Sequence, residues 1–271
     1  MIRVLSLGAG VQSSALALMA AAGEIAPIDV AIFADTQSEP KSVYSWLEYL
    51  RPLLPFPIVT VTAGNLGAEI RACARGERRN DARPPFFIKN EDGSRGILRR
   101  QCTSDYKIEP IQREVRRIIG LKPKQRGPKV PVVQQVIGIS WDERSRQKDS
   151  RKAYIVNENP LVDNRLTRGH CIEWMRNKGH PEPPKSACTF CPYRRPSEWR
   201  RLRDNDPEAF EDACQIDEAI RSPGYCGLVG ESYISDQMIP LREVDLANAA
   251  DNGQLDLQFG MQNECEGMCG L

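Results

Sequence analysis

The sequence predicts an α/β protein built on a doubly wound parallel sheet. Three short apolar, strand-like stretches, at 4–7, 29–35 and 57–63, are each followed by a sequence of helical character. A further strand-like stretch covers 130–140 and follows the helix-like segment 108–120. Strands that alternate with helices in this way are typical of a parallel sheet with right-handed crossovers.

The chain divides into two predicted parts. Residues 1–165 carry the strand and helix alternation, interrupted at about 76–104 by a polar, arginine-rich segment that we interpret as an inserted basic surface loop. Residues 166–271 contain helix-like sequence, a proline-rich stretch with cysteines and an acidic tail. We therefore expect one main α/β domain followed by a small helical, cysteine-bearing subdomain.

The composition is that of an ordinary globular protein, with 41% hydrophobic and 27% charged residues. No apolar run approaches the roughly 20 residues that a membrane span needs, so we expect no membrane partner. The N-terminus lacks the architecture of a secretory signal, which favours a reducing, cytoplasmic location. There the nine cysteines are expected to be metal ligands, redox groups or buried apolar residues rather than disulfides.

The net charge of +1 conceals a strong asymmetry along the chain. Residues 71–152 hold 22 Lys and Arg against 10 Asp and Glu, whereas residues 204–271 hold 2 against 15. One interpretation is a basic face on 71–152 for a polyanionic partner such as nucleic acid. The alternative is that the two segments neutralise each other in the fold.

The sequence GAGVQSS, residues 8–14, lies between the first strand and the first helix. Gly8 and Gly10 permit tight turns and a close approach of the backbone to a phosphate. Ser13 and Ser14 stand at the start of the helix, where hydroxyls and backbone N–H groups can hold phosphate oxygens. The loop has neither the ending of a Walker A sequence nor the GxGxxG spacing. The alternative is a glycine turn required only for packing.

The sequence CTFCPYR is the strongest isolated signal, with Cys188 and Cys191 two residues apart. Neighbouring prolines exclude regular structure and place the pair on a loop or knuckle. Two thiolates at this spacing can bind one ion, as in structural zinc and iron–sulfur sites.

These features together resemble a known family. VLSLGAGVQSSALALM, residues 4–19, is similar to the pyrophosphate loop of the adenine-nucleotide alpha-hydrolase (PP-loop ATP pyrophosphatase) superfamily, and later segments resemble its phosphoadenylylsulfate (PAPS) reductase branch. That loop usually reads SGGxDS. Here Gly8 stands for the first Ser, Ala9 for the first Gly and Gln12 for the Asp. The resemblance spans most of residues 1–200 in motif order.

Three further segments carry the resemblance. FADTQSEP, residues 33–40, is similar to the strand-end Asp-Thr segment of the branch, and QCTSDYKIEP, residues 101–110, to its Cys-Cys-x-x-x-Lys-x-x-Pro segment. In the latter, Cys102 falls on the first Cys and Lys107 on the Lys. GISWDERSRQ, residues 138–147, resembles the Gly-x-Arg-x-x-Glu-Ser-x-x-Arg segment of sulfonucleotide reductases.

The resemblance implies a nucleotide site and a set of catalytic residues. The implied nucleotide contacts are Ser6, Gly8, Ala9, Gly10, Gln12, Ser13, Ser14, Asp35, Thr36, Gly138 and Arg146. The implied catalytic residues are Asp35, Lys107, Arg144 and Cys269. Asp35 also stands at the carboxyl end of a strand, where an open α/β sheet places ligand contacts. The alternative role of Asp35 is as the N-cap of the next helix. The alternative interpretation of residues 142–146 is a charged turn exposed to solvent.

The resemblance also implies a metal centre, because the cysteines aligned with Cys102 are cluster ligands in the iron–sulfur members of the branch. We expect a [4Fe-4S] cluster, with zinc as the alternative. The predicted ligands are Cys102, Cys188, Cys191 and Cys171. Cys226 is a second candidate for the fourth position, although it and Cys171 are as easily buried apolar residues. His170 and His180 could instead complete a zinc site.

The C-terminal sequence NECEGMCGL partly matches the Glu-Cys-Gly-Leu-His tail of the reductases, in which the Cys is a nucleophile. Cys265 or Cys269 could act as a mobile nucleophile or as a resolving pair. The alternative is an inert tail.

The expected function is an enzyme that binds ATP or a related adenine nucleotide, with Mg²⁺, adenylylates an acceptor and uses the cysteine-ligated centre for sulfur transfer. Nucleic acid is a suitable acceptor, and a sulfur or electron donor protein and a homodimer are compatible partners. One alternative is a sulfonucleotide reductase that uses a C-terminal Cys. Another is a non-catalytic nucleotide- or nucleic-acid-binding subunit of a modification complex.

Overall fold

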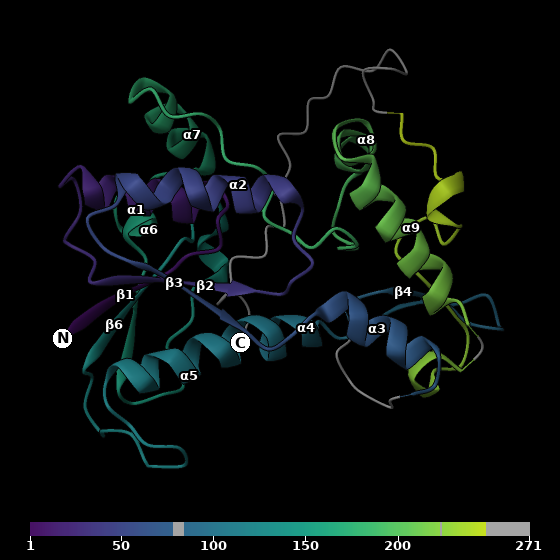
Figure 1. Ribbon diagram of the computed structural model, residues 1–271, viewed down its shortest axis with the longest axis horizontal. Coiled ribbons are helices and arrows are strands. Elements are labelled where there is room, and N and C mark those ends of the chain that lie inside the picture. The colour runs from purple at the N-terminus through teal and green to yellow at the C-terminus, as the bar shows by residue number, and fades with distance from the viewer. Residues whose placement is uncertain (78–83, 223, 248–271) are drawn as a thin grey trace.

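A computed structural model describes residues 1–77, 84–222 and 224–247, in which a five-stranded sheet lies between helices (Figure 1). The strand order is β3-β2-β1-β6-β7, and every pair of neighbours is parallel. The strands are β1 (Ile2–Ser6), β2 (Val30–Asp35), β3 (Ile58–Thr62), β6 (Val133–Ile137) and β7 (Ile155–Glu158). The predicted doubly wound parallel α/β sheet is therefore confirmed.

Helices cover both faces of the sheet because strand residues alternate between the faces. Leu5 and Phe33 pack into one apolar core, and their neighbours Val4 and Ile32 pack into another. The first core is covered by α1 (Val11–Ala21), α2 (Lys41–Leu50), α6 (Pro160–Asp163) and α7 (Arg168–Asn177), and the second by α5 (Glu109–Ile118) (Figure 1).

A separate helical cluster lies beside the sheet (Figure 1). It is formed by α3 (Leu66–Ala74), α8 (Pro196–Asn205) and α9 (Pro207–Ile220). Leu66 and Ile70 share its apolar core with Trp199 and Ile216. This core thus joins a helix from the first half of the chain to two helices from the second half. Conversely, α7, from the second half of the chain, packs with α1 on the sheet.

The predicted surface loop at 76–104 is in part a β-hairpin. β4 (Phe87–Lys89) and β5 (Arg95–Ile97) pair antiparallel, and β8 (Glu231–Tyr233) pairs with the other edge of β4. Gly93, with a φ of 79°, follows Asp92 in the connecting turn, and Asp-Gly is a frequent hairpin turn. The interpretation of this segment as a loop missed the hairpin because its strands are three residues long.

Short helices complete the described structure. The pair α4 (Gln101–Thr103) and a π-helical turn, Ser104–Ile108, lead directly into α5. The 3₁₀ turns are Arg51–Leu53, Trp141–Arg146, Tyr225–Gly227 and Leu241–Glu243. The π-helical turn is of interest because such turns are frequent at functional sites.

Candidate functional site

The chain reverses its progress across the sheet between β1 and β6. From β1 it runs outwards to β2 and β3, then returns to β6 and β7 on the other side of β1. In an open α/β sheet, ligands bind at this point, outside the carboxyl ends of the strands. Ser6 ends β1 beside Ile137, which ends β6, so the loops 7–10 and 138–146 start side by side. The Ser6 hydroxyl accepts a hydrogen bond from Gln135 inside the sheet, at 2.7 Å.

The loop after β1 turns tightly into α1. Ala9 has a left-handed backbone, with a φ of 59°, and Gly10 forms the N-cap with an extended backbone and no side-chain cap. The hydroxyl of Ser13 accepts a hydrogen bond from the N–H of Gly8, at 3.1 Å. A helix N-terminus without a side-chain cap presents backbone N–H groups of the kind that bind phosphate.

The side chains of the same loop have partners inside the protein. The hydroxyl of Ser14 accepts a hydrogen bond from the indole N–H of Trp46, at 2.8 Å. Residues 8–14 are all buried, and the hydroxyl of Ser186 donates a hydrogen bond to the carbonyl oxygen of Gly8. Phosphate binding at this loop would therefore rest on main-chain N–H groups.

Gln12 joins the two loops of the crevice. Its amide N–H group lies 3.4 Å from Ser140 Oγ and 3.2 Å from Glu143 Oε2, and its Oε1 accepts from Arg168 at 3.4 Å. Glu143 forms an ion pair with Arg146. Burial raises the pKa of Glu143, and the charge of Arg146 opposes this rise. Glu143 was not among the predicted nucleotide contacts, yet it places a carboxylate beside Gln12, the residue that stands for the Asp of the related loops.

The remaining residues of the second loop lie at the same edge of the sheet. Gly138 is buried directly after β6. Arg144 is exposed and stacks on Trp141, with its guanidinium carbon 4.8 Å from the ring centroid. Arg144 also donates to the carbonyl oxygen of Trp141 at 3.2 Å. Both of these contacts of Arg144 are therefore with Trp141, in the same 3₁₀ turn.

Asp35 ends β2 and braces the turn that follows. Its Oδ1 accepts from the N–H of Gln37 at 2.7 Å and from the hydroxyl of Tyr44 at 2.9 Å. Burial and the neighbouring carboxylate of Asp35 raise the pKa of Tyr44 well above its usual range. Asp35 does not cap the next helix, because α2 begins at Lys41 with Pro40 as its N-cap.

Three predicted ligand cysteines line one pocket. The pocket is lined by Cys102, from α4, and by Cys188 and Cys191, from the Cys-x-x-Cys turn. Thr36 and Lys107 also line it. We call it the thiol pocket. The thiol of Cys188 lies 3.2 Å from the hydroxyl of Thr36, directly after β2. The fold therefore brings thiols from two distant parts of the chain to the carboxyl edge of the sheet.

Hydrogen bonds fix the shape of the Cys-x-x-Cys turn. The N–H of Cys191 donates to the carbonyl oxygen of Cys188 at 3.0 Å, and the guanidinium of Arg194 donates to the same oxygen at 3.2 Å. The N–H of Thr189 donates to the carbonyl oxygen of Ser38 at 2.8 Å. The turn is thus attached to the segment after β2, which holds it over the edge of the sheet.

A buried ion pair adjoins the thiol pocket. Lys107 Nζ lies 3.3 Å from Glu39 Oε1, and the two side chains are only 7% and 0% exposed. Thr36 Oγ1 is 3.5 Å and Cys188 Sγ is 4.0 Å from the same oxygen. The sequence predicted Lys107 but not Glu39, because an acidic residue before a proline is an ordinary surface feature. The sequence indicated the surroundings of Glu39 only through FADTQSEP, residues 33–40, which stands at the end of a predicted strand.

The thiol of Cys188 is expected to react slowly with alkylating reagents in metal-free protein. Burial raises its pKa well above the usual range, Glu39 raises it further, and Lys107 opposes the rise. Alkylation should be at least about tenfold slower than that of an unstructured thiol at pH 8 and should still accelerate above pH 9, because the thiolate is the reactive form. Peptide mass spectrometry with iodoacetamide measures this rate at each cysteine.

Two variants check the cause. Glu39→Gln removes a negative charge and should speed alkylation of Cys188, whereas Lys107→Met removes a positive charge and should slow it. Equal rates in both variants would show that neither charge controls the thiol.

Cys171, the fourth predicted ligand, does not line the thiol pocket. It is fully buried in α7 and packs in the apolar core of the sheet, as does its neighbour Met175. Here it fills the role of a small apolar side chain. His170 lies in the capping box at the start of α7, and His180 is hydrogen-bonded to Tyr49 at 2.9 Å. None of the three therefore supplies a ligand beside Cys188.

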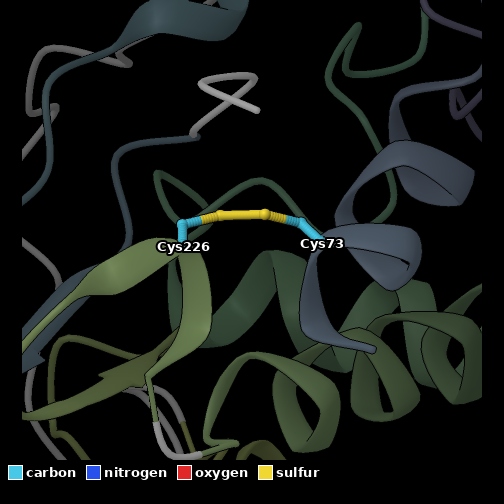
Figure 2. Close-up of a disulfide and its surroundings, with 2 residues drawn as sticks. All are labelled: Cys73 and Cys226. Atoms are coloured by element: carbon cyan, nitrogen blue, oxygen red, sulfur yellow. A yellow bond between two sulfur atoms is a disulfide. The ribbon is translucent and has the colours of Figure 1, made fainter. Parts of the chain in front are cut away.

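Cys226, the other candidate, forms a disulfide with Cys73 (Figure 2). Cys73 lies in α3 and Cys226 in the turn Tyr225–Gly227, with their Cα atoms 6.1 Å apart, a usual separation for a disulfide. This pair differs from the expectation that the cysteines would not form disulfides. That expectation came from the inferred compartment, which carries no information on which cysteines the fold brings together.

The donor set of the thiol pocket suits a soft metal, but it is incomplete. Thiolates are the ligands of iron–sulfur clusters and of many zinc sites. Over residues 1–77, 84–222 and 224–247, no three His, Cys, Asp or Glu side chains lie close enough to hold a metal ion. Cys102, Cys188 and Cys191 thus share a pocket without forming a ready-made site. Cys265 and Cys269, the predicted tail thiols, lie outside the described residues.

The predicted basic stretch at 71–152 uses several of its charges locally. Arg71 forms an ion pair with Asp212 of the acidic segment 204–271. Such a pair is expected if the basic and acidic segments neutralise each other in the fold. Arg117 pairs with Glu114, and Arg75 with Glu77. None of the helices in the described part of the chain is long and apolar enough to cross a membrane.

Comparison with known proteins gives a weak likeness to solved structures. No family model and no curated protein matches the chain. Among solved structures, the chain is similar to a phosphoadenylyl-sulfate (PAPS) reductase from Candida auris, solved as a phosphate complex. The two share 14% identity over 67% of this chain and 74% of the other, with a TM-score of 0.42. A likeness at this level assigns no activity.

Proposed function

We propose that the chain is a PAPS reductase-like enzyme that binds ATP or a related adenylyl nucleotide and transfers sulfur to an adenylylated acceptor. One observation carries the proposal. Ser186, which contacts Gly8 of the glycine loop, is separated from Cys188 by a single residue. The backbone that we propose to bind phosphate and the three thiols therefore lie at the same edge of the sheet, which supports transfer of an activated intermediate from one to the other.

The first proposed step is activation of the acceptor. An oxygen of the acceptor attacks the α-phosphorus of ATP, and pyrophosphate leaves. Backbone N–H groups at the start of α1 would stabilise the charge that develops on pyrophosphate. Arg168 brings a cation to the crevice through its contact with Gln12. Glu143, beside Gln12, is the carboxylate that would hold Mg²⁺ arriving with the nucleotide.

The second proposed step is displacement of AMP by sulfide from a donor protein. A bond forms between the acceptor carbon and sulfur, and the bond from that carbon to the AMP oxygen breaks. Lys107, which lines the thiol pocket, would balance negative charge on the sulfur. Cys102, Cys188 and Cys191 would be the protein ligands of a [4Fe-4S] cluster, which would supply iron-bound sulfur chemistry beside the acceptor. The pocket, of about 30 Å³, would have to open to admit it.

Replacement of Cys188 by serine should abolish sulfur transfer and the metal centre but leave nucleotide binding intact. The matched control is Cys214→Ala, which removes a buried thiol from α9, away from the thiol pocket. Anaerobically purified wild type and control should be brown, with iron and sulfide by analysis and a broad absorption band in the visible region, whereas Cys188→Ser should be colourless. Pyrophosphate release from ATP measures the first step in all three.

The results separate the alternatives. Colourless wild type with stoichiometric zinc would remove the cluster from the proposal. Thiol-dependent release of sulfite from a sulfonucleotide, lost in Cys269→Ser, would replace the proposed function by sulfonucleotide reduction. Nucleotide binding without either reaction would indicate the non-catalytic subunit.

A further inference from the structure

A large groove adjoins the candidate site. It lies between the start of α2, the segment 182–185 and the first turns of α8 and α9, and its volume is about 1110 Å³ against about 30 Å³ for the thiol pocket. The thiol pocket has room for little more than water, whereas the groove can take a large ligand. Six cationic side chains line it: Lys41, Arg168, Lys185, Arg194, Arg195 and Arg201. We call it the basic groove.

Arginines account for the excess of positive charge in the basic groove. Its four acidic residues are Glu182, Glu198, Asp206 and Glu208. Lys41 pairs with Glu208, and Lys185 pairs with Glu198 at 2.6 Å. Asp206 accepts from the N–H of Ala209 at the start of α9. Arginine is the side chain best suited to phosphate, because its planar group can donate two parallel hydrogen bonds.

Four helices begin at the basic groove. Its lining includes residues from the first turns of α2, α7, α8 and α9, which have 10, 10, 10 and 14 residues. The N-terminal end of a helix carries a partial positive charge. Glu198 and Asp206 cap the starts of α8 and α9, so the groove favours an anion chiefly through its excess of six cationic over four acidic side chains.

The basic groove shares its walls with both parts of the candidate site. Arg194, in its lining, donates to the carbonyl oxygen of Cys188 at 3.2 Å. Arg168, also in the lining, donates to Gln12 of the glycine loop. Lys185 immediately precedes Ser186, which contacts that loop. A ligand in the groove would therefore lie next to the crevice and to the thiols.

We propose that the basic groove binds the phosphodiester backbone of a single-stranded nucleic-acid acceptor. This inference rests on the proposed function and identifies where its acceptor binds. The cations are spread over α2, α7, α8 and the segments before α8, which suits a chain of phosphates better than one compact nucleotide. The acceptor is single-stranded because only an unpaired base can leave its neighbours and enter a closed crevice. All six cations lie outside the predicted basic stretch 71–152.

Charge reversal at Arg201 tests the proposal. Arg201 is exposed and lines the groove, whereas Arg203, two residues further along α8, is 48% exposed, pairs with Asp204 and is not in the lining. Binding of fluorescein-labelled single-stranded DNA and RNA of about 20 nucleotides is followed by fluorescence anisotropy over a range of salt concentrations. Arg201→Glu should weaken binding about tenfold and lower the slope of log Kd against log salt by about one. Arg203→Glu should bind within about twofold of wild type.

Three results would overturn the proposal: no binding by wild type at low salt, equal weakening in Arg203→Glu, or tighter binding of duplex than of single strands. Binding of ATP and release of pyrophosphate are measured on the same preparations. Wild type that binds ATP but not the oligonucleotides overturns the groove and leaves the proposed function standing. Wild type that binds the oligonucleotides with the expected loss in Arg201→Glu, but binds no ATP, supports the groove and overturns the proposed function.

Discussion

Lys107→Met is expected to lower the free energy of unfolding by about 3–5 kcal/mol, because it leaves the Glu39 carboxylate buried without its countercharge. The Glu39 side chain is fully buried, and its second oxygen, Oε2, accepts no hydrogen bond in the described part of the chain. Removal of the ammonium group therefore leaves a buried carboxylate without a countercharge. Methionine keeps most of the length of the lysine side chain, so the effect reports on charge. Urea denaturation followed by tryptophan fluorescence measures the loss.

An exposed ion pair supplies the matched control. Lys41 and Glu208 form an ion pair with side chains 77% and 81% exposed, and Lys41→Met should cost less than about 1 kcal/mol. The double variant Lys107→Met/Glu39→Leu should recover most of the lost stability, because no unpaired charge stays buried. Equal losses in Lys107→Met and Lys41→Met would contradict the burial of the Lys107–Glu39 pair.

Loss of the Cys73–Cys226 disulfide is the second large expected effect. The bond joins residues 153 positions apart, so its reduction should lower the free energy of unfolding by about 2–5 kcal/mol, mainly by releasing a long loop in the unfolded chain. Denaturation with and without dithiothreitol measures the difference. The double variant Cys73→Ala/Cys226→Ala should resemble reduced wild type and should not respond to the reductant. If dithiothreitol still lowers the stability of the double variant, the effect of the reductant does not come from the Cys73–Cys226 disulfide.

Much of the central fold could be predicted from the sequence. Each predicted strand was a short apolar stretch followed by helical sequence, and β1, β2, β3 and β6 form where these stretches lie. β7 was missed because its sequence, IVNE, has only two apolar residues. The long-range partners of α3 were missed for another reason. Packing of α3 against α9 joins segments more than a hundred residues apart, and no local pattern encodes such a pairing.

The candidate site was predictable in its parts and less so in its assembly. The glycine loop and the Cys-x-x-Cys turn are local features, so spacing alone identified them. Cys171 was one of two candidates for the fourth ligand, with burial in a core as its alternative, and the structure places it in a core. Glu39 escaped notice because an isolated glutamate is common on protein surfaces, and Glu143 was identified only as one charged residue of the segment 142–146, without its contact to Gln12. Their importance arises only from burial, and burial depends on the whole fold.

The contact between Ser186 and Gly8 has a consequence for how the two halves of the site communicate. One residue separates Ser186 from Cys188, so this contact holds the glycine loop and the Cys-x-x-Cys turn in one relative position. A rearrangement of either segment would change the position of the other, and such linkage between two sites is reciprocal.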